Sequence, residues 1–581
     1  MSEQHSSQPA GVGPETQTPA RRCPRVWPAA VILALQFLSQ WVYAKFSTTN
    51  VQSGIELGAF TLFGTLLLIV WWLGFSRTPW RDRLLGVALF VAAVAAVVLS
   101  QANAAYGAML LVYAVPRMLA GVVALLLVTA WLRWPVRRWV LVVYIIGCCA
   151  AHMAMRFESV GGNLAPEVSW RWNPSRLERS GAMARPGTQG TAALPEEVAD
   201  GDYPAFRGPA RDGRLAGVAF STDWAAPPRE VWRREVGPGW SSFIAVGDYL
   251  FTQEQRGPEE VVSCYHAGTG EEVWTNGTTA LFDDDMGIGP RATPTYDRGR
   301  LYTQGATGIL QCLDAATGAT VWKRDLKEDA GCGVPGYGFT SSPLVTGGLV
   351  VAFTCGPEGK SAAAYDTATG DIAWFSGHKS TAYSSPQLVD IGGVPQILLN
   401  GEWGLQSLNP ETGALLWGHP WSIKTFPIGT QAVVFGDTFL IGATGTTGSR
   451  IVKAEKKGEE WETAQVAATK LFRPYFNNSV EHKGYCYGYD DQRIACISME
   501  TGERRWQGEK WGGQLLLLAD MDLLLVLTEK GQVVLLKADP ERLVEVARFQ
   551  ALKGKTWNHP IIAHGRLYVR NSEEAACFQL N

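Results

Sequence analysis

Apolar and polar positions follow two patterns along this chain: long continuous apolar runs come first, and short strands separated by turns follow. Each apolar run is long enough, or nearly so, to cross about 30 Å of hydrocarbon as a helix. We therefore predict membrane spans over residues 27–44, 55–75, 84–103, 107–132 and 139–155. A disordered cytoplasmic tail, residues 1–25, precedes the predicted five-helix transmembrane domain at residues 26–155.

Basic residues orient these spans. Three arginines occur in each of three segments that alternate with segments holding only Lys45 or no basic residue: Arg21, Arg22 and Arg25; Arg77, Arg81 and Arg83; Arg133, Arg137 and Arg138. Tryptophans gather near the same ends: Trp71, Trp72, Trp80, Trp131, Trp134 and Trp139. Because Lys and Arg favour cytoplasmic loops, we predict a multi-pass protein of the bacterial inner membrane. Its N-terminus is then cytoplasmic and its C-terminal part periplasmic.

One charged residue lies inside the fourth predicted span. Arg117 follows Pro116 about ten residues from the outer end, which is roughly 15 Å deep at 1.5 Å per residue. Such charges are costly and often functional. Two interpretations stay open: Arg117 snorkels or pairs with a neighbouring carbonyl freed by Pro116, or it lines a polar pocket for a quinone or a lipid headgroup.

The chain becomes periodic after a linker at residues 156–200, in which Trp170, Arg171 and Trp172 form a candidate membrane-surface cluster. The repeated unit is an apolar strand, Thr-Gly, three residues and Trp. It occurs at Thr269-Gly270 with Trp274, Thr317-Gly318 with Trp322, Thr369-Gly370 with Trp374, Thr412-Gly413 with Trp417 and Thr501-Gly502 with Trp506. Single steps of 43 to 52 residues between these turns are typical of β-propeller blades.

The number of repeats predicts an all-β eight-bladed propeller over residues 201–581. Outer strands are expected near Trp232, Trp274, Trp322, Trp374, Trp417, Trp461, Trp506 and Val546. The segment 230–234 is an outer strand without inner partners, and the last predicted blade lacks an outer strand. We therefore predict that this segment closes the last blade. Seven blades is the competing count, because the fifth repeat is weak.

Loops that lead into the innermost strand of each blade, here called the axial loops, should converge on the propeller axis, opposite the Thr-Gly turns. They are rich in aromatic, hydroxyl and amide side chains, the composition of a ligand pocket; a polar channel filled with water is the alternative. The candidate pocket residues are Trp240, Arg291, Trp511, Trp557, Asn558 and His559.

The Ala-x-Thr-Gly-x-x-x-Trp repeat and the segment 203–213, Tyr-Pro-Ala-Phe-Arg-Gly-Pro-Ala-Arg-Asp-Gly, resemble the pyrroloquinoline-quinone-type (PQQ-like) propeller repeat family. That family includes quinoprotein dehydrogenases and a β-barrel-assembly lipoprotein without a cofactor. The five-span architecture is similar to membrane-bound quinoprotein glucose dehydrogenase, whose electrons pass to ubiquinone. The resemblance implies PQQ with Ca²⁺ as a candidate cofactor. However, the adjacent pair Cys148-Cys149 lies in a predicted span, and residues 201–581 contain no such pair.

A quinone-dependent oxidation needs a planar platform, a cation near the cofactor and a base. Trp240, Trp511 and Trp557 are candidate platforms, Arg291 the cation and His559 the base, while the catalytic residues remain unknown. Carboxylates expected on the same face are Glu254, Asp283, Asp284, Asp285, Glu402, Asp490 and Asp491. The run 283–285 is a candidate Ca²⁺ site or a solvated acidic loop.

Cysteines give a weaker signal. Cys332 and Cys355 are expected on the axial-loop face, either as a disulfide or as two free thiols. The remaining propeller cysteines that recur at one repeat position predict buried packing: Cys264, Cys312, Cys496 and Cys577.

The charge composition argues against one class of function. The net charge is −3 and charged residues make up 18% of the chain, which does not favour nucleic-acid binding. Three interpretations compete: a membrane-tethered binding or assembly platform, a quinoprotein dehydrogenase that feeds membrane quinone, and a ligand sensor. We favour the platform, with the lipid bilayer and a periplasmic protein or a small-molecule ligand as partners; ubiquinone is a partner of the alternative.

Overall fold

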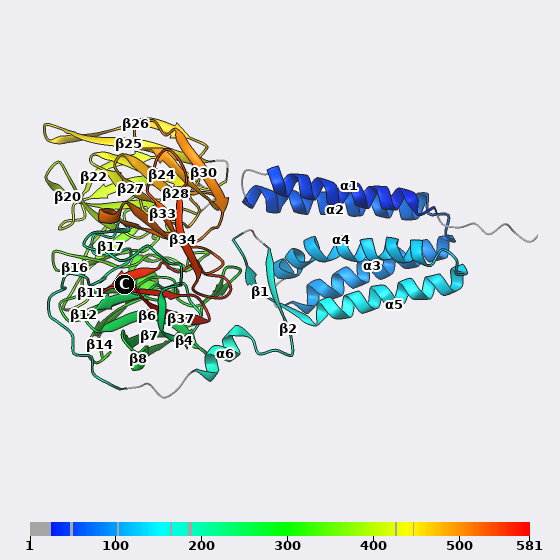
Figure 1. The fold of residues 1–581 in the computed structure, drawn as a ribbon, viewed down its shortest axis with the longest axis horizontal. Helices are drawn as coiled ribbons and strands as arrows, with labels where there is room; N and C mark the ends of the chain where they lie inside the picture. The colour runs from blue at the N-terminus through cyan, green and yellow to red at the C-terminus, as the bar shows by residue number, and fades with distance from the viewer. Residues whose placement is uncertain are drawn as a thin grey trace, which may run out of the picture. The chain divides into compact units, whose positions relative to one another are not determined.

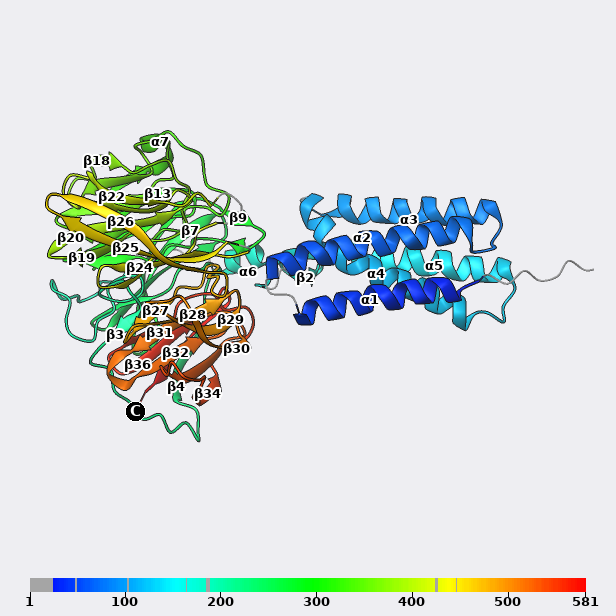
Figure 2. The same cartoon turned by 90° about the horizontal axis from the view of Figure 1, so that it is seen from above.

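The computed structural model describes residues 25–46, 50–101, 104–162, 165–183, 189–423, 427–445 and 447–580. It divides into a helical unit and a β unit, which are considered separately (Figures 1 and 2). Apart from Arg25, the predicted tail lies outside the described residues.

Five helices form the helical unit: α1 (Trp27–Phe46), α2 (Asn50–Gly74), α3 (Trp80–Ser100), α4 (Ala104–Val128) and α5 (Trp134–Met153). Within the described residues, four stretches are long and apolar enough to cross a membrane: Leu57–Gly74, Trp80–Ser100, Tyr106–Val128 and Trp134–Met153. The apolar stretch Trp27–Val42 of α1 is shorter. A helix thus lies at each predicted span, and a fifth crossing stays a prediction.

Two helices begin earlier than the apolar pattern predicts. α3 begins at Trp80 after Pro79, and α5 begins at Trp134 with Pro135 in its first turn. Proline favours helix starts because its missing N–H has no intrahelical partner there. The arginines that follow belong to the helices, so hydrophobicity alone located these two starts too late.

Arg117 is exposed on the helical unit and donates from Nη1 to the carbonyl oxygen of Tyr113 at 2.8 Å. Pro116, which has no N–H, leaves the carbonyl of Val112 without its helical donor. That oxygen accepts a hydrogen bond from Thr61 Oγ1 in α2 at 3.3 Å. Arg117 therefore pairs with a carbonyl of its own helix, but not with the carbonyl that Pro116 frees, which Thr61 occupies.

Eight antiparallel sheets form the propeller in the β unit (Figure 1). Blades one to four are β5 (Ile244–Val246), β6 (Tyr249–Arg256), β7 (Glu259–His266), β8 (Glu272–Thr279); β11 (Thr295–Asp297), β12 (Arg300–Gln304), β13 (Ile309–Asp314), β14 (Thr320–Asp325); β15 (Leu344–Thr346), β16 (Leu349–Phe353), β17 (Ala362–Asp366), β18 (Ile372–Ser376); and β19 (Gln387–Ile391), β20 (Val394–Gly401), β21 (Gly404–Leu408), β22 (Leu415–Pro420).

Blades five to eight are β23 (Val433–Phe435), β24 (Thr438–Ala443), β25 (Gly448–Lys457), β26 (Glu460–Thr469); β27 (Val480–His482), β28 (Tyr485–Asp490), β29 (Arg493–Ser498), β30 (Arg504–Lys510); β31 (Gln514–Leu518), β32 (Leu523–Leu527), β33 (Gln532–Lys537), β34 (Glu545–Gln550); and β35 (Ile561–Ala563), β36 (Arg566–Arg570), β37 (Glu574–Gln579), β4 (Arg229–Glu235). The remaining short elements are β1 (Met155–Val160), β2 (Pro166–Trp170), β3 (Arg214–Leu215), β9 (Asp283–Asp284), β10 (Gly287–Ile288), α6 (Arg176–Ala182) and α7 (Leu326–Ala330).

The predicted ring closure is confirmed. β4 pairs antiparallel with β37, and Trp232 lies opposite Cys577. The eighth blade therefore combines the two ends of the array, and both the eight-blade prediction and the role of residues 230–234 hold. β3, which was not predicted, adds a short parallel strand to β31.

The Thr-Gly…Trp signature joins neighbouring blades through a contact between an indole and a turn glycine, here called the latch. In four successive pairs, the outer-strand indole packs on the Gly of the next blade's turn: Trp232 on Gly270, Trp274 on Gly318, Trp322 on Gly370 and Trp374 on Gly413. Gly318 has φ of 73°, a conformation that favours glycine. A Cβ added there would lie 2.4 Å from the ring of Trp274.

Small buried residues lie opposite these indoles on the third strand. Cys264, Cys312, Cys496 and Cys577 are all buried and pair across the sheet with Trp274, Trp322, Trp506 and Trp232. A thiol is small enough to leave room for the ring. Their recurrence therefore reflects packing, as predicted.

Candidate functional site

A cavity with a volume of about 170 Å³ opens on the propeller axis at the axial-loop face. All eight blades contribute to it. Its described lining residues are Phe206, Trp240, Met286, Arg291, Tyr337, Thr340, Ser342, Tyr383, Ser385, Pro427, Gly429, Tyr475, Phe476, Asn478, Gln514, Trp557 and His559. The axial loops therefore converge as strand alternation predicts.

Four of the six candidate pocket residues line this cavity: Trp240, Arg291, Trp557 and His559. Each stands two or four residues before the first residue of an innermost strand. Asn558 and Trp511 stand three residues before theirs. Neither is among the described lining residues. For Asn558, a shift of one residue in an extended segment turns the side chain to the opposite side. Trp511 precedes Gly512 and Gly513, both at positive φ, so the alternation does not apply to it.

Asn558 and Trp511 have other contacts. Buried Asn558 donates from Nδ2 to the carbonyls of Gly239 and Ser241, at 3.2 and 2.8 Å. The Trp511 indole donates to Glu509 at 2.9 Å and lies under the Arg548 guanidinium. Their contacts stabilise the axial loops and the blade surface.

Much of the recurring hydroxyl and amide chemistry links neighbouring blades. In six neighbouring blade pairs, the residue two positions before the innermost strand donates its backbone N–H to a side chain of the next blade. The acceptor stands at the equivalent position in five pairs, and in the sixth it is Gln514, the first residue of β31. The observed pairs are Ser242 to Thr293, Thr293 to Ser342, Ser342 to Ser385, Gln431 to Asn478, Asn478 to Gln514 and His559 to Ser242. The lining also contains seven Phe, Tyr and Trp side chains, which take no part in these links.

Two tryptophans lie side by side in the cavity wall, next to a lysine. The rings of Trp240 and Trp557 are 4.8 Å apart, and Phe476 lies 4.8 Å from Trp557. Lys555 places its Nζ 4.3 Å from the Trp557 ring centroid and 5.1 Å from that of Trp240. Both indole Nε1 atoms are buried and have no hydrogen-bond partner among the residues that the structure describes. Buried donors are usually paired, so these two call for an explanation.

Sequence reasoning missed Lys555, which stands next to the Thr556 axial loop. Its Nζ donates to Ser159 Oγ and to the Val160 carbonyl, both at 2.8 Å, and pairs with Glu167 at 3.2 Å. Burial lowers the pKa of Lys555 to about 8. The sequence signal for this residue was a single lysine next to an aromatic loop. It was not enough to assign a role, because the partners of Lys555 lie far away in the chain, in the linker.

Arg291 is not a free cation. Its Nη2 donates to Asp284 Oδ1 at 2.6 Å, and its Nη1 donates to the Tyr337 carbonyl at 2.9 Å. His559 is a poor candidate base, because burial and the nearby Arg207 charge hold its pKa well below the usual value. It packs edge-on against Phe206, with ring centroids 4.9 Å apart.

The candidate carboxylates do not line the cavity. Glu254 is buried and accepts from Arg256 Nη2 at 2.7 Å, and Asp490 accepts from Arg473 Nε at 2.5 Å. Among the described residues, no group of three His, Cys, Asp or Glu side chains is arranged to hold a metal ion. The run 283–285 therefore gives no described Ca²⁺ site, and its Asp284 serves as the partner of Arg291.

The segment 203–213 that carries the family resemblance plugs the axis. Phe206 lines the cavity, while the guanidinium groups of Arg207 and Arg211 are buried. Arg211 donates to the carbonyls of Ser342, Pro343 and Pro386 and to Thr295 Oγ1. Arg207 donates to Gln431, Asp212 and Ser479. These contacts tie together blades two to six.

Cys332 and Cys355 are free thiols. The Sγ of Cys332 donates to the Thr354 carbonyl at 3.1 Å, and that of Cys355 to the Ala382 carbonyl at 3.5 Å. Of the two alternatives, the structure therefore has the thiol pair.

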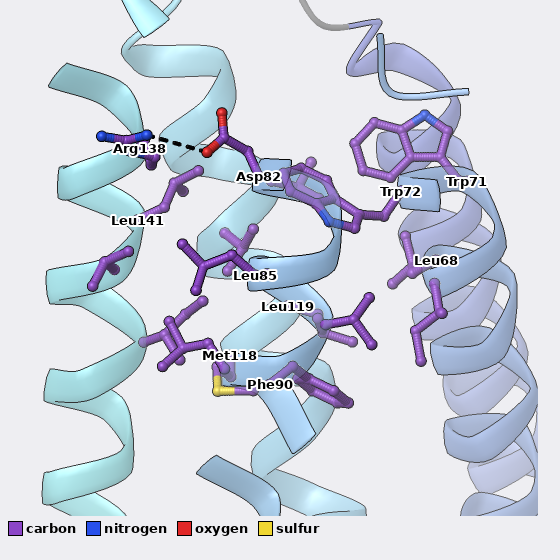
Figure 3. A pocket seen from close by; sticks show the side chains of 18 of the residues that line it. Leu68, Trp71, Trp72, Asp82, Leu85, Phe90, Met118, Leu119, Arg138 and Leu141 are labelled. Atoms are coloured by element: carbon purple, nitrogen blue, oxygen red, sulfur yellow. Dashed lines mark hydrogen bonds and ion pairs between the residues drawn. The ribbon is translucent and has the colours of Figure 1, made fainter. Parts of the chain in front are cut away.

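The helical unit holds a separate apolar pocket of about 110 Å³ between α2, α3, α4 and α5 (Figure 3). Leu85, Phe90 and Met118 are among the side chains that line it. At one end, Asp82 pairs with Arg138 at 3.2 Å and accepts from the Trp134 indole at 2.6 Å. These polar groups pair with each other, so a molecule in this pocket would contact mainly apolar side chains.

Comparison with known proteins agrees with the repeat pattern. Residues 258–508 match the family model described as outer membrane protein assembly factor BamB. This match agrees with the resemblance of the repeat to PQQ-type propellers. The assembly factor BamB of Yersinia pestis is 22% identical over 294 residues, covering 48% of this chain and 71% of that protein.

Solved structures also resemble the PQQ-type propeller. BamB from Moraxella catarrhalis is 14% identical with a TM-score of 0.45, covering 61% of this chain and 100% of that chain. Quinohemoprotein alcohol dehydrogenase from Comamonas testosteroni is 15% identical with a TM-score of 0.46, covering 65% of this chain and 80% of that chain.

Proposed function

We propose that this protein is a membrane-anchored extracytoplasmic binding platform. Its PQQ-type propeller holds a small ligand, or a segment of a partner protein, in the axial cavity. The observation that carries the proposal is the aromatic wall with two buried, unpartnered indole N–H groups. Apolar walls with a few unpaired donors suit binding, whereas none of the described lining residues is a carboxylate that would take a proton from an alcohol.

Membrane anchoring is supported by the apolar helices and by the arginines at their predicted cytoplasmic ends. We place the protein in the bacterial inner membrane with its propeller in the periplasm. The match to an outer membrane protein assembly factor supports a periplasmic protein as partner.

The residues present do not fit PQQ with Ca²⁺. An aromatic platform exists at Trp240 and Trp557, but Arg291 is engaged by Asp284, and the described residues hold no metal-ligand cluster. We therefore assign no reaction step to this cofactor.

The alternative function, an alcohol or sugar dehydrogenase that passes electrons to membrane quinone, is tested directly. Purified full-length protein is incubated with PQQ and Ca²⁺ and assayed for dye reduction with alcohols and aldoses. We expect no activity; activity would overturn the platform proposal.

The positive test uses a photo-crosslinking amino acid, p-benzoylphenylalanine, in place of cavity-lining Tyr383 in living cells. An exposed aromatic residue at the far end of an innermost strand, Phe435, is the matched control. We expect a discrete adduct at position 383 and none at position 435. A peptide adduct identifies a protein partner, and a small added mass identifies a ligand. Equal adduct formation at both positions, or none at 383, contradicts the proposal.

A further inference from the structure

Two tryptophans outside the propeller blades form an exposed stacked pair. Trp170 and Trp172 have ring centroids 4.7 Å apart and ring planes 8° apart. They are 38% and 68% exposed, and Val168, on the same side of β2 as Trp170, is 44% exposed. Exposed apolar groups gathered in this way mark an interaction surface. We call Val168, Trp170 and Trp172 the indole face.

The register of the β1–β2 hairpin fixes where this face lies along the chain. β1 and β2 pair antiparallel, with Met155 opposite Trp170. Met155 is the second residue after Met153, the last residue of α5. Neighbouring strands are about 4.8 Å apart, so Trp170 lies one strand spacing from the residue at which the chain leaves α5.

The other face of the hairpin is polar and already engaged. Glu167 pairs with Arg176 at 3.1 Å and with Lys555 at 3.2 Å. The backbone N–H of Val160 donates to the Asp285 carbonyl at 2.8 Å. These contacts fix the hairpin on the propeller, so the alternation of β2 leaves the indole face directed outward.

We propose that the indole face inserts into the headgroup region of the bilayer leaflet at which α5 ends. The inference rests on the proposed membrane anchoring. Tryptophan prefers the membrane–water interface, where its ring is amphipathic, and a helix that spans the bilayer must end at that depth. Arg171, exposed between the two indoles, adds a guanidinium at the level of lipid phosphates. The hairpin then anchors the propeller at a second point, independent of the spans.

The test places p-benzoylphenylalanine at three positions of the full-length chain in native membranes, one at a time. Trp172 is the test position, and Leu66, 57% exposed on α2, reports whether the helices contact lipid. Phe435, 45% exposed on the propeller, is the negative control. After illumination, mass spectrometry identifies the adducts. We expect phospholipid adducts at positions 172 and 66, each several-fold above position 435.

The outcomes separate the inference from the function on which it rests. Absence of lipid adducts at position 66 overturns the membrane anchor itself. Lipid adducts at position 66 with none at 172 overturn only the indole face as a lipid contact. Protein adducts at 172, from a partner or from a second copy of this chain, also overturn it. Because position 172 is exposed, the substitution leaves the fold intact, and the Phe435 variant controls for the modification.

Discussion

The latch between blades one and two predicts a large and site-specific loss of stability. Trp274 is 0% exposed, its indole donates to the Ala315 carbonyl at 3.1 Å, and its ring packs on Gly318. Trp274→Ala empties this volume between two sheets whose backbones are fixed by their own ladders. Large-to-small aromatic substitutions of this kind cost about 3–5 kcal/mol because the cavity does not collapse.

The chain offers a matched control in its degenerate fifth blade. Trp461 stands three residues after its turn glycine, Gly458, instead of four, and it is half-buried against the cluster that contains Trp417. The next turn glycine, Gly502, contacts Ala467 and not this indole. Trp461→Ala should therefore cost only about 1 kcal/mol. Trp274→Phe keeps a ring but leaves the Ala315 carbonyl without its donor, which predicts an intermediate loss of about 1–3 kcal/mol.

The assay is pulse proteolysis of the full-length protein in detergent micelles across a urea gradient. It reports the fraction of chains whose propeller resists cleavage. The signal therefore does not depend on tryptophan fluorescence, which the substitutions themselves would change. We expect the free energy of unfolding to be highest in Trp461→Ala, lower in Trp274→Phe and lowest in Trp274→Ala. If Trp274→Ala and Trp461→Ala lose equal stability, the latch is not what joins the blades, and the interpretation of the repeat signature is wrong.

Three further predictions follow from single contacts. Burial alone would raise the pKa of Glu254, but its arginine partners lower it to about 2, below the ordinary 4.5. Its stabilising contribution is therefore complete above pH 4.5 and is lost as the pH falls toward 2; in Glu254→Gln, acid unfolding curves should lose that component. Alkylation of unfolded protein without reductant should label both Cys332 and Cys355, and protected thiols in the mass spectrum would indicate a disulfide. Arg117→Leu should retain membrane insertion and thermal stability, because among the described residues the side chain donates to a carbonyl of its own helix; a clear loss of folded protein would revive the polar-pocket interpretation.

The blade count could be predicted because each repeat signals its own turn and outer strand. Thr-Gly followed by Trp specifies a reversal and a large ring at fixed spacing, and these features depend on neighbouring residues. The closure by residues 230–234 followed from counting, since one outer strand was left over at each end. The fifth blade was predicted weakly because its turn is Lys457-Gly458 rather than Thr-Gly, yet strand pairing with its neighbours completes it.

The candidate site was predicted only in part. Local pattern located the axial loops, but it did not distinguish Trp557, which lines the cavity, from Asn558, which does not. A strand must be placed to within one residue before its alternation assigns the correct side. The hydroxyl and amide groups were taken as ligand contacts, whereas most of them complete hydrogen bonds between blades.

Sequence alone determined the repeat and the apolar helices, because each depends on side chains close together along the chain. The closing strand followed from the repeat count, which left one outer strand over. Tertiary structure decided that the segment 203–213 plugs the axis, that Lys555 reaches the linker hairpin, and that Trp170 lies opposite Met155. The first two contacts join segments whose meeting depends on how all eight sheets close into one ring. The third depends on the register of a hairpin. Which side chains meet across the closed ring is a global property that no local pattern encodes.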